Sequence, residues 1–298
     1  MKALVISGGG SKGAFAGGFA EHLIDDLGIQ YDILVGTSTG SLMVPHLSIN
    51  KVDKIKKVYT NVGQKDIYNI CPFRIKKKAN GEVKSSINHR NTLRMFLKKK
   101  KTFGEHKNLR KTIMKSYTRE DHAQVQQSGK SVVVTVSNLT TKRVESKFAA
   151  DFAYDDYIDW MWASTSFVPF MSLVEKNGYE YADGGFGNYI PIEEAINLGA
   201  KEIDVIVLTP RHQLMENNKT TNAFELILQS LQFMLYQLGS HDILIGHLES
   251  IYNHDVKVNF HFTPRSLTPY SFYFDPIQMK AWWKEGYEYA KLRMNSQS

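Results

Sequence analysis

The sequence has little cysteine and no long apolar run, and we expect no N-terminal targeting segment. Cys71 is the single cysteine in 298 residues, which excludes an intramolecular disulfide and fits a reducing compartment. No run approaches the ~20 apolar residues of a membrane-spanning helix. Residues 2–6 enter a strand directly, without the charged, apolar and cleavage regions of a signal peptide. We therefore expect a cytoplasmic protein, soluble or peripheral to a membrane.

Apolar residues are nevertheless plentiful. They make up 42% of the chain, and 12% of the residues are aromatic, which is ample for a large buried core and excludes a disordered chain. The length allows one α/β domain or two small ones. Because no internal repeat or low-complexity linker divides the chain, we expect one domain over residues 1–298.

The net charge of +7 is concentrated in one segment. Residues 51–115 hold 20 of the 37 Lys and Arg but only 4 of the 30 Asp and Glu, so they carry +16 and the remainder carries −9. We expect residues 51–130 to be an insertion or lid-like segment. A solvated face is the simplest interpretation, and contact with anionic lipid, at ~1 kcal/mol per basic residue, is the second. No nucleic-acid-binding module is recognisable, so no nucleic acid partner is expected.

A Gly-x-Ser-x-Gly pattern occupies residues 36–40. An apolar strand candidate precedes it at residues 33–35, and a helix can begin at residues 41–44. This context is typical of a nucleophile elbow, in which the glycines permit a tight turn and the serine is exposed at the end of the strand. The pattern alone also fits an ordinary Gly/Ser-rich turn. In its context it makes Ser38 a candidate nucleophile.

A glycine-rich loop at residues 8–13 lies between a buried-strand pattern at residues 4–6 and a helical pattern at residues 14–27. Its spacing matches the dinucleotide-binding fingerprint, but that fingerprint needs an acidic residue after the second strand, and none stands there. A P-loop needs lysine after its last glycine, whereas Lys12 precedes Gly13.

An oxyanion hole is the third interpretation of this loop. Backbone N–H groups at a helix N-terminus can stabilise a developing negative charge. Because neighbouring parallel strands end at the same edge of a sheet, the loop would lie beside Ser38. This interpretation is favoured because it uses both loops.

Residues 178–183 alternate as a strand and end in Asp183, which two glycines follow. A hairpin turn is the simplest interpretation. However, the residues after Pro191 resemble a helix start rather than a partner strand. The remaining patterns predict strands at residues 132–136, 143–148, 202–208 and 256–262, and helices at residues 54–62, 91–99, 155–163, 192–198, 224–238, 242–252 and 277–294.

Three motifs in this order resemble those of the patatin-like phospholipase family of serine acyl hydrolases. They are the glycine loop at residues 8–13, the elbow at residues 36–40 and Asp-Gly-Gly at residues 183–185. The small-residue and proline segment at residues 163–170 is also similar to the family segment before the catalytic aspartate. The resemblance covers residues 1–50 and about 160–208. It implies a three-layer α/β/α fold with a mostly parallel central sheet.

The resemblance also implies a Ser–Asp dyad in place of a Ser–His–Asp triad. Ser38 would be the nucleophile and Asp183 the general base. Lys12 and Thr39 are supporting candidates, and Lys12 would either hold a lipid phosphate or order its loop. The implied oxyanion hole consists of the backbone N–H groups of Gly8, Gly9 and Gly10.

The implied activity is that of a lipid acyl hydrolase, a phospholipase A-type esterase that forms an acyl-Ser38 intermediate. Such an enzyme needs no metal or organic cofactor. Its expected partners are phospholipid or another lipid ester, with peripheral contact to an anionic membrane through residues 51–115.

Three alternatives remain open. An α/β-hydrolase triad would take its histidine from the C-terminal region. A nucleotide-binding protein would use the loop at residues 8–13, and a catalytically silent lipid-binding protein would keep the dyad with its access closed. The candidate triad histidines are His241, His247, His254 and His261.

Overall fold

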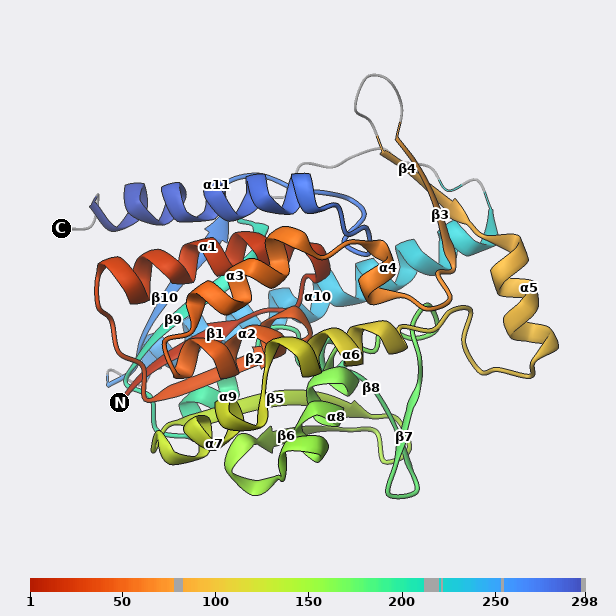
Figure 1. The fold of residues 1–298 in the computed structure, drawn as a ribbon. Coiled ribbons are helices and arrows are strands. Elements are labelled where there is room, and N and C mark those ends of the chain that lie inside the picture. The colour runs from red at the N-terminus through yellow and green to blue at the C-terminus, as the bar shows by residue number, and fades with distance from the viewer. Residues whose placement is uncertain (78–82, 212–219, 221, 253–254, 296–298) are drawn as a thin grey trace.

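A computed structural model describes residues 1–77, 83–211, 220, 222–252 and 255–295 (Figure 1). Its main sheet has the order β10-β9-β1-β2-β5-β8-β7, with β6 also paired to β5. The strands from β10 to β5 are parallel, and β6, β7 and β8 are antiparallel to their neighbours. The strands are β1 (Lys2–Ile6), β2 (Ile33–Thr37), β5 (Ser131–Asn138), β6 (Arg143–Phe148), β7 (Val174–Lys176), β8 (Tyr179–Asp183), β9 (Glu202–Pro210) and β10 (Lys257–Thr263), and a separate hairpin pairs β3 (Phe73–Lys77) with β4 (Val83–Ile87).

Helices cover both faces of the main sheet. The α-helices are α1 (Gly13–Glu21), α2 (Thr39–Ser48), α3 (Val52–Asn61), α4 (Gln64–Ile67), α5 (His89–Leu97), α6 (Lys107–Ser116), α7 (Arg119–Gln127), α8 (Tyr154–Ser164), α9 (Ile192–Asn197), α10 (Ala223–Tyr252) and α11 (Pro276–Asn295). Short turns of 3-10 or π-helix are η1 (Gly10–Lys12), η2 (His22–Asp26), η3 (Ala149–Asp151) and η4 (Gly184–Phe186).

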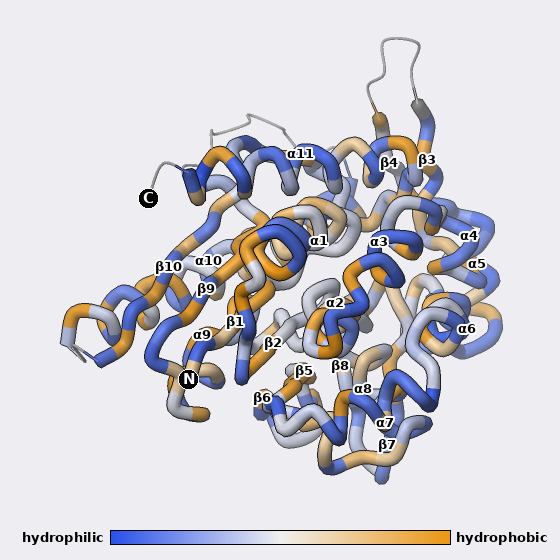
Figure 2. The backbone as a smooth tube through the Cα atoms, turned by 60° about the vertical axis from the view of Figure 1, so that its left-hand side comes forward, coloured by the Kyte–Doolittle hydropathy of each residue, from blue (hydrophilic) through white to orange (hydrophobic). Residues whose placement is uncertain are grey.

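The central strands are buried on both faces, as continuous apolar runs in a parallel sheet require. Along β1, Leu4 and Ile6 join the core under α1, α2, α3 and α11, whereas Ala3 and Val5 join the core under α9 and the second half of α10. Figure 2 shows hydrophobic residues along these strands. The predicted three-layer fold with a mostly parallel sheet is confirmed. The single domain over residues 1–298 stays a prediction.

One predicted boundary is wrong. The two helices expected at residues 224–238 and 242–252 form the single helix α10. A glycine inside a helix costs only about 1 kcal/mol relative to alanine, so Gly239 does not end it. At Gly239 a Cβ would lie 3.0 Å from the ring of Tyr189, so the glycine lets α10 pack closely on that ring. None of the described helices combines the length and apolar content that crossing a bilayer requires.

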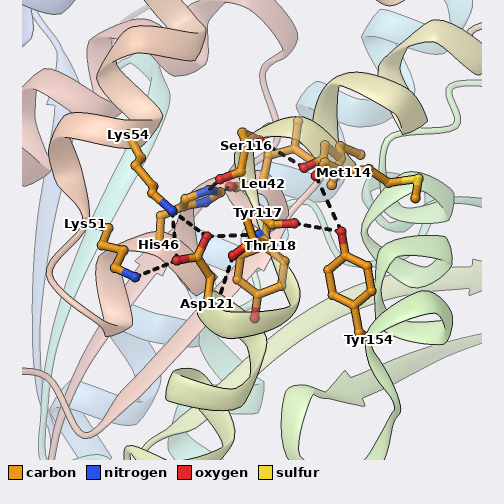
Figure 3. A network of polar contacts seen from close by, with 11 residues as sticks. Leu42, His46, Lys51, Lys54, Met114, Ser116, Tyr117, Thr118, Asp121 and Tyr154 are labelled. Carbon is orange, nitrogen blue, oxygen red and sulfur yellow. Dashed lines mark hydrogen bonds and ion pairs between the residues drawn. The ribbon is translucent and has the colours of Figure 1, made fainter.

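Part of the basic segment is tied into the body of the protein. Lys51 and Lys54 hold the buried carboxylate of Asp121 in α7 at 2.5 and 2.7 Å (Figure 3). Burial alone would raise the pKa of Asp121, but these hydrogen bonds and the backbone N–H of Thr118 keep it well below its usual value. These lysines therefore stabilise the contact between α3 and α7.

The crossing of α1 and α11 gives a test of the fold. A Cβ on Gly18 would lie 1.9 Å from the carbonyl oxygen of Trp283. Gly18→Ala should therefore destabilise the protein by about 1–3 kcal/mol, since overpacking outweighs the gain in helix propensity. Urea unfolding measures this, with Ser230→Ala on the exposed side of α10 as control. A Gly18→Ala protein as stable as the wild type would contradict the tight crossing.

Candidate active site

Ser38 lies at the turn between β2 and α2. Its backbone angles, φ 53° and ψ −116°, are ones that an L-residue rarely adopts. Two glycines make the turn sterically possible. A Cβ on Gly36 would lie 2.4 Å from the carbonyl oxygen of Gly40, and a Cβ on Gly40 would lie 2.3 Å from that of Ile6. The strand, sharp turn and helix have the geometry of a nucleophile elbow.

The sheet brings Asp183 to this turn. Strand β5 lies between β2 and β8, where Thr37 pairs with Thr135 and Asp183 pairs with the next residue, Val136. The Ser38 hydroxyl donates a hydrogen bond to Asp183 Oδ2 over 2.7 Å, although 145 positions separate the two residues. Sheet register therefore produces the contact.

Asp183 lies in surroundings that disfavour its charge. Burial raises the pKa of Asp183 to about 7, although the Gly185 N–H, 2.8 Å from Oδ1, and the Ser38 hydroxyl both lower it. A carboxylate with a pKa near neutrality can act as a general base at physiological pH. The Asp183 backbone is also fixed, because its N–H donates to the carbonyl of Ser166 over 2.9 Å.

The glycine loop lies beside Ser38, but its N–H groups are not equivalent. Gly8 donates its N–H to the carbonyl of Tyr189 over 3.0 Å, and Ser11 donates to the carbonyl of Ser271 over 2.9 Å. Within the described ranges, the N–H groups of Gly9 and Gly10 have no hydrogen-bond acceptor. Both glycines line the same pocket as Ser38. The backbone N–H groups of Gly9 and Gly10 are thus two hydrogen-bond donors available to a ligand beside Ser38.

The two supporting candidates have different surroundings. Lys12 Nζ donates to the carbonyl of Leu208 over 2.7 Å, and burial lowers the pKa of Lys12 to about 8. This contact ties the glycine loop to the end of β9, and Lys12 does not line the pocket of Ser38. Thr39 lines that pocket, and its hydroxyl is hydrogen-bonded to the hydroxyl of Tyr59.

Sequence reasoning missed two residues at the site. Ser164 Oγ accepts the backbone N–H of Ser38 over 3.0 Å and so helps to hold the strained elbow. The ring of Tyr189 covers the glycine loop, since a Cβ on Gly8 would lie 2.7 Å from it. Only the run of small residues before Pro169 signalled Ser164, and nothing in the sequence signalled Tyr189.

The pocket at Ser38 is small and mainly apolar, with a volume of about 90 Å³. Gly9, Gly10, Ser38, Thr39 and Asp183 all line it. The other lining residues come from distant parts of the chain and include Leu42, Val58, Tyr59, Val62, Ile67, Leu109, Phe167, Met171, Leu235, Phe272, Phe274 and Met279. Such a lining suits an aliphatic chain next to the serine.

None of the described histidines hydrogen-bonds to Ser38 or Asp183. His241 is exposed, His247 packs on Phe260, and His261 Nε2 lies 3.3 Å from Asp204 Oδ1. His254 lies outside the described residues. Among the described residues, no group of three or more His, Cys, Asp and Glu side chains could hold a metal ion.

The comparison with known families decides the classification. The sequence model of patatin-like phospholipases matches residues 4–196, which is more than half of the chain. The chain belongs to the patatin-like phospholipase family. At family level this makes it a lipid acyl hydrolase.

Other comparisons add information on the fold alone. No curated protein sequence matches this patatin-like protein. Among solved structures it is similar to VipD from Legionella pneumophila, with a TM-score of 0.50 and 13% sequence identity. The match covers 99% of this chain and 67% of that chain.

Labelling of Ser38 in this patatin-like protein tests the site. A carboxylate accepts the serine proton only when ionised, so the rate of fluorophosphonate labelling should rise with pH and reach half its plateau near the Asp183 pKa of about 7. In Asp183→Asn the rate should fall at least ~100-fold and lose this pH dependence. Intact-protein mass spectrometry follows the reaction, and Ser38→Ala is the unlabelled control. A pH-independent rate in the wild type would contradict the assignment.

Proposed function

We propose that this protein hydrolyses carboxylic esters of lipids, in the manner of a phospholipase A, through an acyl-Ser38 intermediate. The observation that carries the proposal is the 2.7 Å hydrogen bond from Ser38 Oγ to the buried Asp183 carboxylate, in a pocket with an apolar lining. In the first step Ser38 Oγ attacks the ester carbonyl carbon while its proton passes to Asp183 Oδ2. The base is then neutral, which its burial favours.

The attack turns the carbonyl oxygen into an oxyanion. The backbone N–H groups of Gly9 and Gly10 are the proposed donors, because both glycines line the pocket and their N–H groups lack another acceptor among the described residues. Gly8 was included in the predicted hole, but its N–H is engaged by Tyr189, so its proposed role is to let that ring pack closely on the loop. Lys12 is proposed to order the loop through Leu208.

The tetrahedral intermediate collapses by breaking the bond to the leaving alcohol, which takes the proton from Asp183. Water then attacks the acyl carbon and gives a proton to Asp183, which returns it to Ser38 Oγ as the fatty acid leaves. These steps balance without a cofactor. The proposed substrates are phospholipids or other lipid esters. The basic segment at residues 51–115 supports an encounter with them at an anionic membrane.

Hydrolysis of p-nitrophenyl butyrate and of phospholipid tests the dyad. Ser38→Ala and Asp183→Asn should each lower kcat/KM at least ~1,000-fold, because nucleophile and base act as one unit. His241→Ala and His247→Ala are matched controls and should stay within about twofold of the wild type. Equal activity in the dyad variants, or a comparable loss from one histidine, would refute the mechanism.

Acyl-chain preference tests the pocket. Its volume of about 90 Å³ is well below the 300–1,000 Å³ of typical ligand pockets, so short esters should react faster than long ones. Phe272 lines the pocket, and Phe272→Ala should raise kcat/KM for the decanoate relative to the butyrate by about 10-fold. Phe233→Ala, an exposed phenylalanine on α10, is the control. An unchanged chain-length profile in Phe272→Ala would show that this pocket does not bind the acyl chain.

A further inference from the structure

Helix α5 exposes three large apolar side chains. Leu93 is 57%, Phe96 is 76% and Leu97 is 72% exposed, whereas Met95 on the opposite side is buried. Helical spacing puts these three side chains on one outward face. A contiguous exposed apolar face is typical of a surface that contacts a partner or a membrane.

The surroundings of this face are strongly basic. Arg90 and Arg94 lie on α5 beside the apolar side chains, and Lys98 and Lys99 follow directly after the helix. These four have no carboxylate partner within the part of the chain that the structure describes. From residue 69 to 104, the described ranges contain no Asp or Glu at all.

Other basic residues of residues 51–115 are used within the fold. Lys51 and Lys54 bind Asp121 (Figure 3), Lys56 binds Glu21, and Lys101 binds Glu175 and Glu180. What distinguishes the surroundings of α5 is that their unpaired positive charge lies next to exposed apolar side chains. An apolar helix face flanked by Arg and Lys is typical of a helix that lies in the interface of an anionic membrane.

The base of α5 connects to the catalytic pocket through phenylalanine rings. The β3–β4 hairpin precedes α5, and Phe73 at the start of β3 stacks on Phe272 with ring centroids 5.8 Å apart. Phe272 in turn stacks on Phe167 at 4.6 Å. Phe167 and Phe272 line the pocket of Ser38. Figure 1 shows α5 at the same end of the molecule as this hairpin and the start of α10.

We propose that α5 and the lysines that follow it anchor the protein on an anionic lipid layer, with Leu93, Phe96 and Leu97 inserted among the lipid chains. The anchor holds the end of the molecule that carries the phenylalanine rings, and with it the pocket of Ser38, against the lipid surface. The choice of lipid over a protein partner rests on charge complementarity. The statement that this lipid layer also supplies the substrate rests on the proposed function. The docking of α5 on the lipid layer does not depend on it.

Vesicle binding tests the anchor without catalysis. In a Ser38→Ala background, the full chain should co-sediment with vesicles of phosphatidylcholine and phosphatidylglycerol. Binding should weaken in high salt and on pure phosphatidylcholine. The double substitution Phe96→Ser and Leu97→Ser should weaken it at least ~10-fold.

The matched control lies on α11, where Ile277 and Leu292 are 78% and 71% exposed. The double substitution Ile277→Ser and Leu292→Ser should bind like its parent. Thermal unfolding checks that both double variants are folded. With Ser38 restored, the α5 variant should hydrolyse soluble p-nitrophenyl butyrate at the wild-type rate but vesicle phospholipid at least ~10-fold more slowly.

The outcomes separate the two proposals. Equal vesicle binding by the α5 variant and its parent, or no binding by the parent, would overturn the anchor. So would a parent dimer that the α5 substitutions convert to a monomer, because a second copy would then cover this face. If the α5 substitutions abolish vesicle binding but the wild-type protein hydrolyses no ester, the anchor is supported and the proposed function is rejected.

Discussion

The burial of one carboxylate governs the site. Asp183 is buried at the end of β8, and a charge there lacks the solvation that water would give it. The Gly185 N–H and the Ser38 hydroxyl offset only part of this penalty, so the carboxylate retains a strong tendency to take up a proton. The hydroxyl of Ser38, 2.7 Å away, can supply this proton. In the proposed mechanism, burial thus gives Asp183 useful strength as a base without a histidine.

The rest of the fold keeps this pair together. The parallel register of β2 and β5, and the antiparallel pairing of β5 with β8, fix the distance between serine and aspartate. Gly36 and Gly40 make the strained elbow sterically possible, and Ser164 accepts the backbone N–H of Ser38. Because these supports belong to separate elements, the site depends on the correct packing of the whole sheet.

Much of this arrangement could be predicted from the sequence, because it depends on local patterns. Apolar runs gave the central strands, and Gly-x-Ser-x-Gly gave the elbow at Ser38. The pairing with Asp183 came from the family resemblance. Features that depend on contacts between distant residues could not be predicted. The backbone carbonyl of Tyr189 accepts the Gly8 N–H, its ring packs against Gly239 inside α10, and neither contact leaves a local signal.

The pairing of charges in the basic segment at residues 51–115 could not be predicted either, for the same reason. Its charge was evident from composition, but which lysines are paired depends on where Asp121 and other acidic side chains lie in the fold. The structure separates lysines that stabilise α3 from those beside the apolar face of α5. A count of charges in the sequence therefore could not locate the proposed membrane-binding surface. Its location depends on which charged side chains lack a partner and lie next to exposed apolar side chains.

The proposed mechanism requires that burial make Asp183 a base that titrates near neutrality. Infrared difference spectra of the wild type minus Asp183→Asn isolate the carboxyl band of this residue as the pH is varied. The account predicts a protonated carboxyl that ionises with a pKa of about 7. Ionisation near the usual value for aspartate, ~4, would contradict it.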